Sequence, residues 1–164
     1  MQNVYLGIVL VPLIGAIVAG LFGRKIGRSG AHWVTIIGVA ISFLLSLVVL
    51  HHHVLSGAEP YNGSVYTWMV LEGIGVESVI RLEIGFLVDN LTAVMISTVT
   101  FVSLMVHIYT IGYMHDDEGY QRFFCYIALF TFAMLMLVMA NNFLQLFFGW
   151  EGVGLVSYLL IGFW

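Results

Sequence analysis

The chain has 164 residues, of which 61% are hydrophobic and only 9% are charged. A soluble domain of this length needs far more polar surface, so the composition excludes a water-soluble globular protein and predicts a multi-span membrane protein. The net charge of −4, with five Lys and Arg residues in all, offers no basic surface for nucleic acid. The lone cysteine, Cys125, excludes a disulfide within these residues and a cysteine-built zinc or iron–sulfur site.

Apolar runs that are long enough to cross a hydrocarbon layer of ~30 Å recur along the chain. The first contains Pro12, which a membrane helix tolerates as a kink. We therefore expect an all-α membrane protein with about five transmembrane helices and one external β-hairpin between the second and third. The predicted spans cover about residues 4–22, 33–50, 91–111, 123–140 and 143–164.

Charge in the loops predicts the topology. Residues 23–30 hold three of the five basic residues, so the positive-inside rule places this loop in the cytoplasm and the N-terminus outside. Residues 112–122 then form a second cytoplasmic loop, in which Asp116, Asp117 and Glu118 are adjacent. These acids lack the spacing of a calcium loop, and we expect a solvated turn.

The long segment after the second span is predicted to lie outside the membrane. Residues 65–70 are β-prone, and residues 80–84 alternate apolar with charged side chains, which is typical of a half-buried strand. We expect a β-hairpin over about residues 61–88, with its turn at Glu72-Gly73-Ile74-Gly75. The three histidines at 51–53 point ~100° apart on a helix and cannot close on one metal, so we interpret them as a water-exposed helix end.

The third span carries polar side chains on one face, at Thr100, Ser103, His107 and Thr110. Their spacing of three and four residues aligns them along the helix. One interpretation is hydrogen bonding between helices. The other makes His107 a proton relay, because an ordinary imidazole pKa of ~6.5 suits proton exchange. The residues alone leave both interpretations open.

The fifth span carries one carboxylate, Glu151, about 12 Å along a helix that starts at Phe143. That depth is near the membrane midplane, where an acidic residue costs about 2.5–3.5 kcal/mol on insertion scales. Glu151 is therefore a candidate proton-loading site, whose pKa rises on desolvation and falls beside a cation. The alternatives are a permanent salt bridge or a protonated, hydrogen-bonded acid. Because spans three to five contain no Lys or Arg, a basic partner must come from elsewhere.

The residues around Glu151 carry a family resemblance. Gly-Trp-Glu-Gly-Val-Gly-Leu at 149–155, continued by Ser-Tyr-Leu-Leu-Ile-Gly at 157–162, closely resembles the L subunit of bacterial respiratory complex I, an antiporter-like membrane subunit equivalent to the mitochondrial fifth core membrane subunit. The resemblance covers residues 1–164 as an N-terminal portion of an antiporter-like transmembrane domain. Further matching segments are Trp68-Met69, Leu87-Val88-Asp89, His107-Ile108-Tyr109, Gly112-Tyr113-Met114, Glu118-Gly119-Tyr120 and Arg122-Phe123-Phe124.

The resemblance implies a proton-translocating subunit of NADH:quinone oxidoreductase in the bacterial inner membrane rather than the mitochondrial one. NADH, FMN, iron–sulfur clusters and quinone are then expected in partner subunits, with no cofactor in this chain. Its implied partners are the other membrane-arm subunits and the lipid bilayer. Glu151 matches the family's fifth-span glutamate, whose partner is a lysine on a later broken helix, beyond residue 164. His107 also matches the family sequence, but the resemblance assigns no role to it.

Two other functions share these features. The large subunit of a multisubunit Na⁺/H⁺ antiporter has the same architecture, and a non-catalytic membrane scaffold could keep Glu151 for assembly alone.

Overall fold

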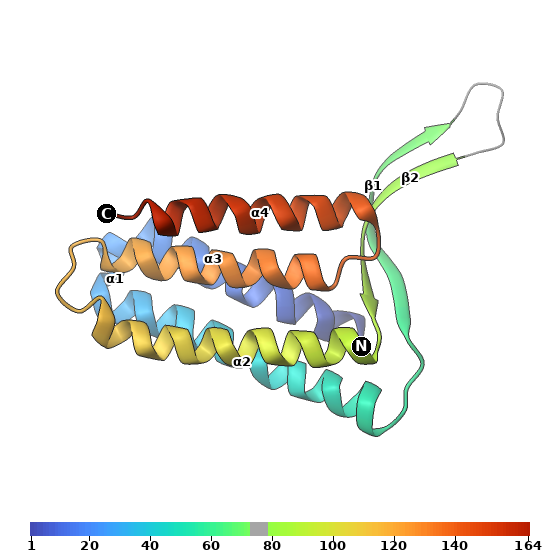
Figure 1. The fold of residues 1–164 in the computed structure, drawn as a ribbon, viewed down its shortest axis with the longest axis horizontal. Coiled ribbons are helices and arrows are strands. Elements are labelled where there is room, and N and C mark those ends of the chain that lie inside the picture. Colours follow the sequence, from blue (N-terminus) through green and yellow to red (C-terminus); the bar gives the residue numbers. More distant parts are fainter. Residues whose placement is uncertain (73–78) are drawn as a thin grey trace.

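The computed structural model describes residues 1–72 and 79–164, and the predicted turn residues Gly73 to Gly75 lie outside that part. Long helices lie side by side, and a β-hairpin extends from one end (Figure 1). The N-terminus lies at the hairpin end and the C-terminus at the opposite end. The elements are α1 (Gln2–Leu50), a short π-helix η1 (His51–Leu55), β1 (Tyr61–Glu72), β2 (Val79–Val88), α2 (Asn90–Tyr113), α3 (Tyr120–Val138) and α4 (Phe143–Ile161).

Helix α1 is two antiparallel arms joined at Gly27, whose φ of 72° and ψ of −177° break the helix. A positive φ is a conformation that glycine adopts without steric cost. The arms pack closely, since the Ser42 hydroxyl donates to the Ile8 carbonyl at 2.8 Å. The predicted eight-residue loop at 23–30 is wrong in extent, because helix continues on both sides of this one glycine.

The described residues contain four helices that are long and apolar enough to cross a membrane. Because the first of these, over Gln2–Leu55, folds back on itself, the fold agrees with the predicted five crossings. Side-chain caps define two of the helix starts. The Asp89 carboxylate accepts from the Thr92 N–H at 2.7 Å, and the Asn142 side chain accepts from the Gln145 N–H at 2.9 Å. The loop between α2 and α3 is shorter than the predicted residues 112–122, since α2 ends at Tyr113 and α3 begins at Tyr120.

The hairpin is confirmed, with β1 and β2 antiparallel and Tyr61 opposite Val88. Two register shifts in β1 bend it. It is fastened to the turn between α3 and α4, where the Leu87 N–H donates to the Met139 carbonyl at 3.0 Å. The Asn142 amide also donates to the Glu83 carbonyl, at 2.8 Å.

The prediction of a water-exposed end at the three histidines is wrong for His53. Its side chain is 1% exposed, and its Nε2 lies 3.0 Å from the Tyr5 hydroxyl. The first arm of α1 covers it, and the Tyr5 ring in turn packs on Tyr61 of the hairpin, with ring centroids 5.0 Å apart. The part of the chain that the structure describes holds no group of three or more His, Cys, Asp or Glu that could bind a metal.

Candidate functional site

The polar face predicted on α2 lies in the interior. Thr100, His107 and Thr110 are buried. Hydroxyl groups of this face bond to side chains of neighbouring helices, whereas the hydrogen bonds of His107 and Thr110 stay within α2. The Thr100 hydroxyl lies 3.0 Å from that of Ser46 on α1, and the Ser103 hydroxyl bonds that of Thr131 on α3. We call this set the α2 polar seam: Ser46, Ser97, Thr100, Ser103, His107 and Thr131.

Sequence reasoning missed the members of the seam that lie outside α2. Ser46 follows Thr35 and Ser42 at helical spacing, so a polar face could have been recognised in the second span. Thr131 is the single Ser or Thr of the fourth span, and only its place in a membrane helix could have drawn attention to it, because such hydroxyls commonly bond across helices.

His107 has one nitrogen bonded and one free. Its Nδ1 lies 2.8 Å from the Ser103 carbonyl, which can only accept, so Nδ1 carries the proton in the neutral ring. Its Nε2 is buried and has no hydrogen-bond partner among the residues described. Because Nδ1 is the donor, Nε2 is an unprotonated acceptor. The imidazole therefore offers a proton-accepting atom inside the bundle.

Glu151 lies midway along α4, on a face that the described residues leave exposed. Tyr158 (73% exposed) and Leu155 (60% exposed) lie on the same face. No hydrogen bond or ion pair reaches its carboxylate from the described part of the chain. The structure thus presents the carboxylate outward, away from the bundle formed by residues 1–164.

The opposite side of α4 packs on α3 through glycines. A Cβ added at Gly149 would lie 2.8 Å from the Leu137 Cα, and one at Gly152 would lie 3.2 Å from the Ala133 Cβ. This close approach is the usual role of small residues between membrane helices. Because the two glycines face α3, the carboxylate of Glu151 faces away from it.

The structure does not bring His107 and Glu151 together. Helix α3 lies between α2 and α4 in Figure 1 and packs against both. The fourth span, predicted to start at residue 123, starts three residues earlier in the structure. Arg122 therefore lies in the first turn of α3. That guanidinium stacks over the Phe163 ring, 4.7 Å from its centroid, rather than pairing with Glu151.

The loop between α2 and α3 is an anchored turn rather than a simple solvated one. Arg28 donates to the carbonyls of His115 and Asp117, and thus joins the α1 bend to the α2–α3 loop. The Asp117 carboxylate accepts from the Trp164 indole at 2.9 Å and from the Gly119 N–H at 2.6 Å. These two bonds, the indole first, hold the pKa of Asp117 below its usual value.

Membrane-length helices, a buried polar seam and one outward carboxylate define a polytopic membrane protein. Residues 74–124 match the family described as NADH-ubiquinone oxidoreductase (complex I), chain 5 N-terminus. This match includes His107 and ends before Glu151.

Relatives align along almost the whole chain. It is 61% identical over 164 residues, 99% of the chain, to NADH-quinone oxidoreductase subunit L of Neisseria meningitidis serogroup B. It is 45% identical over 163 residues to subunit L of Rickettsia bellii, and 48% identical over 160 residues to NADH-ubiquinone oxidoreductase chain 5 of Arabidopsis thaliana. These alignments cover 99% and 98% of the chain, but the chain spans only 23–24% of each relative's length. The resemblance is thereby confirmed: the chain is similar over its whole length to an N-terminal portion of complex I subunit L and chain 5.

Proposed function

We propose that residues 1–164 form the N-terminal portion of a proton-translocating membrane subunit of an NADH:quinone oxidoreductase. The observation that carries the proposal is the 61% identity along the whole chain to a subunit L. The relatives reported above are oxidoreductase subunits, which favours complex I over the Na⁺/H⁺ antiporter. The redox cofactors and quinone belong to partner subunits, and the other membrane-arm subunits are the partners of this chain.

In this proposal Glu151 is the proton-loading carboxylate. Its face of α4 is open for a further segment to pack against it, and a cation on that segment would change its proton affinity. The neutral acid is favoured in a desolvated site, and an approaching positive charge favours the carboxylate and releases the proton. His107 is the second relay, since its unprotonated Nε2 can accept a proton within the seam.

We also propose the membrane orientation. The N-terminus and the hairpin lie at one end of the bundle, whereas the bend at Gly27 and the C-terminus lie at the other (Figure 1). Four of the five basic residues, Arg24, Lys25, Arg28 and Arg122, belong to the second end. The positive-inside rule therefore supports a bacterial plasma membrane protein with its N-terminus outside.

The central test replaces Glu151 with Gln in the full-length subunit within its complex. Inverted membrane vesicles would report NADH oxidation and proton uptake together, and complex assembly would be measured in the same membranes. We expect normal assembly with a large loss of protons moved per NADH oxidised. The matched control is Glu118→Gln, an exposed acid in the α2–α3 loop, which should leave pumping unchanged.

Two results would count against the proposal in different ways. Unchanged pumping with normal assembly contradicts the proton-loading role of Glu151. Loss of assembly in Glu151→Gln, with Glu118→Gln intact, supports the scaffold function instead. For His107, replacement by Gln should lower pumping while leaving NADH-driven electron transfer measurable with an uncoupler present.

A further inference from the structure

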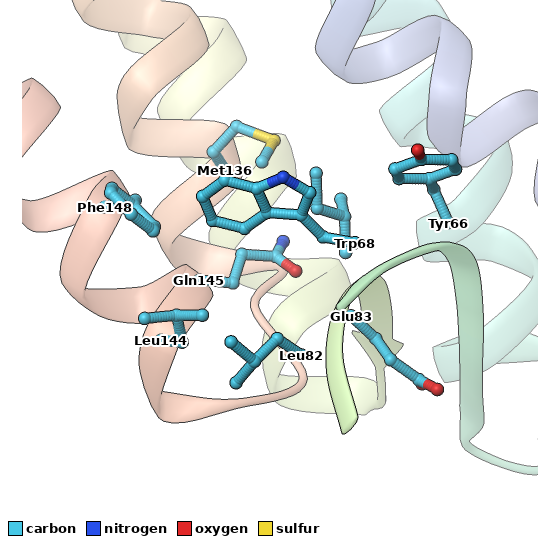
Figure 2. Close-up of a pocket in the computed structure, with 9 residues that line it drawn as sticks. Tyr66, Trp68, Leu82, Glu83, Met136, Leu144, Gln145 and Phe148 are labelled. Atoms are coloured by element: carbon cyan, nitrogen blue, oxygen red, sulfur yellow. The ribbon is translucent and has the colours of Figure 1, made fainter. Parts of the chain in front are cut away.

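A cavity of about 400 Å³ lies where the hairpin meets the near ends of α3 and α4 (Figure 2). We call it the hairpin cavity. The hairpin contributes Tyr66, Trp68 and Leu82, while Met136 comes from α3 and Phe148 from α4. The Trp68 and Phe148 rings meet edge to face, with centroids 6.2 Å apart. Its volume falls within the ~300–1,000 Å³ of ordinary small-ligand sites.

One buried polar side chain, Gln145, lines this apolar cavity. It is 3% exposed, and its Oε1 accepts from the Gly85 N–H at 2.9 Å. That bond fixes the orientation of the amide, because a backbone N–H needs an acceptor. The remaining Nε2 is buried and has no hydrogen-bond partner within the described residues. In Figure 2 this nitrogen lies on the side of the Trp68 indole.

A buried N–H without an acceptor is rare, so the unpartnered Nε2 indicates a missing acceptor in the cavity. Water fits poorly, because a buried water needs two to four polar partners. Among the other polar groups of the lining, the Glu83 carboxylate and the Tyr66 hydroxyl lie away from Gln145 in Figure 2. The Trp68 indole N–H can only donate. The occupant must therefore be apolar over most of its length and carry an acceptor that needs no donor in return.

The place of the cavity identifies the class of occupant. It lies at the ends of membrane-length helices, at the level where the hairpin leaves the bundle (Figure 1). Trp68 and Tyr66 are 59% and 61% exposed at its mouth, and such aromatic side chains are enriched where acyl chains meet headgroups. The ester carbonyl of a glycerophospholipid lies at that depth, accepts hydrogen bonds and donates none.

We propose that the hairpin cavity binds a glycerophospholipid from the leaflet on the hairpin side. One acyl chain lies between the hairpin and Met136 and Phe148, and its ester carbonyl accepts from Gln145 Nε2. The site requires only that the helices span a membrane, so it stands independently of the proton-loading role of Glu151. A bound lipid would fill the gap between the hairpin and the bundle and would steady the hairpin against α4.

The test uses the full-length protein in its complex, in nanodiscs of phosphatidylethanolamine and phosphatidylglycerol. These contain a small fraction of phosphatidylcholine with a diazirine in one acyl chain. After illumination, peptide mass spectrometry compares labelling of Met136 and Leu144 with that of Phe101, an exposed α2 residue outside the cavity. We expect the cavity residues to be labelled at least several-fold more, and still to be labelled when unlabelled lipid is exchanged in before illumination.

Two variants make the test specific. Leu82→Trp fills the cavity, and Gln145→Met removes the N–H donor while keeping an unbranched side chain of similar length. Both should reduce labelling of Met136 and Leu144 several-fold and leave that of Phe101 unchanged. Equal labelling of all three residues in the unaltered protein, or cross-links from the cavity to another protein segment, would overturn the site. A loss in Leu82→Trp but not in Gln145→Met would overturn the assigned hydrogen bond.

Discussion

The polar groups of the α2 polar seam and the carboxylate on the exposed face of α4 differ in burial and in hydrogen bonding. In the seam, hydroxyl groups bond across α1, α2 and α3, and the buried imidazole of His107 bonds to Ser103 within α2. On α4, one carboxylate stands on an exposed face with no bond from the described residues. The seam is therefore complete within these 164 residues, apart from Nε2 of His107, whereas the function proposed for Glu151 needs groups from outside them.

The largest expected difference in stability is between substitutions on the two sides of α4. Gly149→Ala places a Cβ 2.8 Å from the Leu137 backbone, and such overpacking costs about 1–3 kcal/mol. Gly154→Ala is the matched control, because no atom of the described residues lies within 4 Å of its Cβ position. Thermal unfolding of the purified full-length protein should show a lower Tm for Gly149→Ala alone. Equal losses for both would show that another segment packs tightly on the outer face of α4.

The N-terminal cap of α2 offers a second test, with a smaller expected effect on stability. Asp89→Ala removes the cap on the Thr92 N–H and should cost about 1 kcal/mol. That bond also holds the pKa of Asp89 below its usual value. Because the folded-state pKa is lowered, the stabilisation is present above the unfolded value of ~3.9 and is lost as pH falls through the folded pKa. Asp89→Asn should keep the cap but lose this acid dependence, which unfolding at pH 3 and pH 6 would measure.

Substitutions of a buried seam residue and of the exposed acid should change the free energy of unfolding by different amounts. His107→Leu removes the bond from Nδ1 to the Ser103 carbonyl and should cost about 0.5–1.5 kcal/mol. Glu151→Gln removes no contact within the described fold, so these residues should contribute no more than about 0.5 kcal/mol to its effect. Guanidinium or heat denaturation of the two variants would measure the difference. A larger loss in Glu151→Gln would mean that its face is tightly covered in the full-length protein.

The smallest expected effect is that of a single seam hydroxyl. Thr131→Val keeps the side-chain shape but removes the bond to the Ser103 hydroxyl. Such bonds within membranes average about 0.6 kcal/mol. We expect a slight fall in Tm, with Thr98→Val on the exposed side of α2 as the control. If Thr131→Val instead lowered proton pumping without changing Tm, the seam would belong to the proton path rather than to helix packing.

Much of the fold could be predicted because a membrane requires long apolar helices, and the loops that connect them are polar. All five predicted spans begin or end within three residues of an observed helix end, and the alternation at 80–84 located β2. The alignment of Thr100, Ser103, His107 and Thr110 followed from the 3.6-residue period alone. Glu151 was recognised as unusual because no local sequence feature compensates a carboxylate at that depth.

What periodicity could not predict depended on contacts between distant residues. A single glycine with positive φ, not a polar loop, turns α1, and the packing of its first arm buries His53 against Tyr5. The partners Ser46 and Thr131 are 54 and 28 residues from the groups they bond, and the hairpin cavity exists only where three elements meet. The sequence by itself determined the membrane class, the spans and the polar residues within them. Only the tertiary structure decided which of these groups face each other, because side-chain direction depends on how the helices pack.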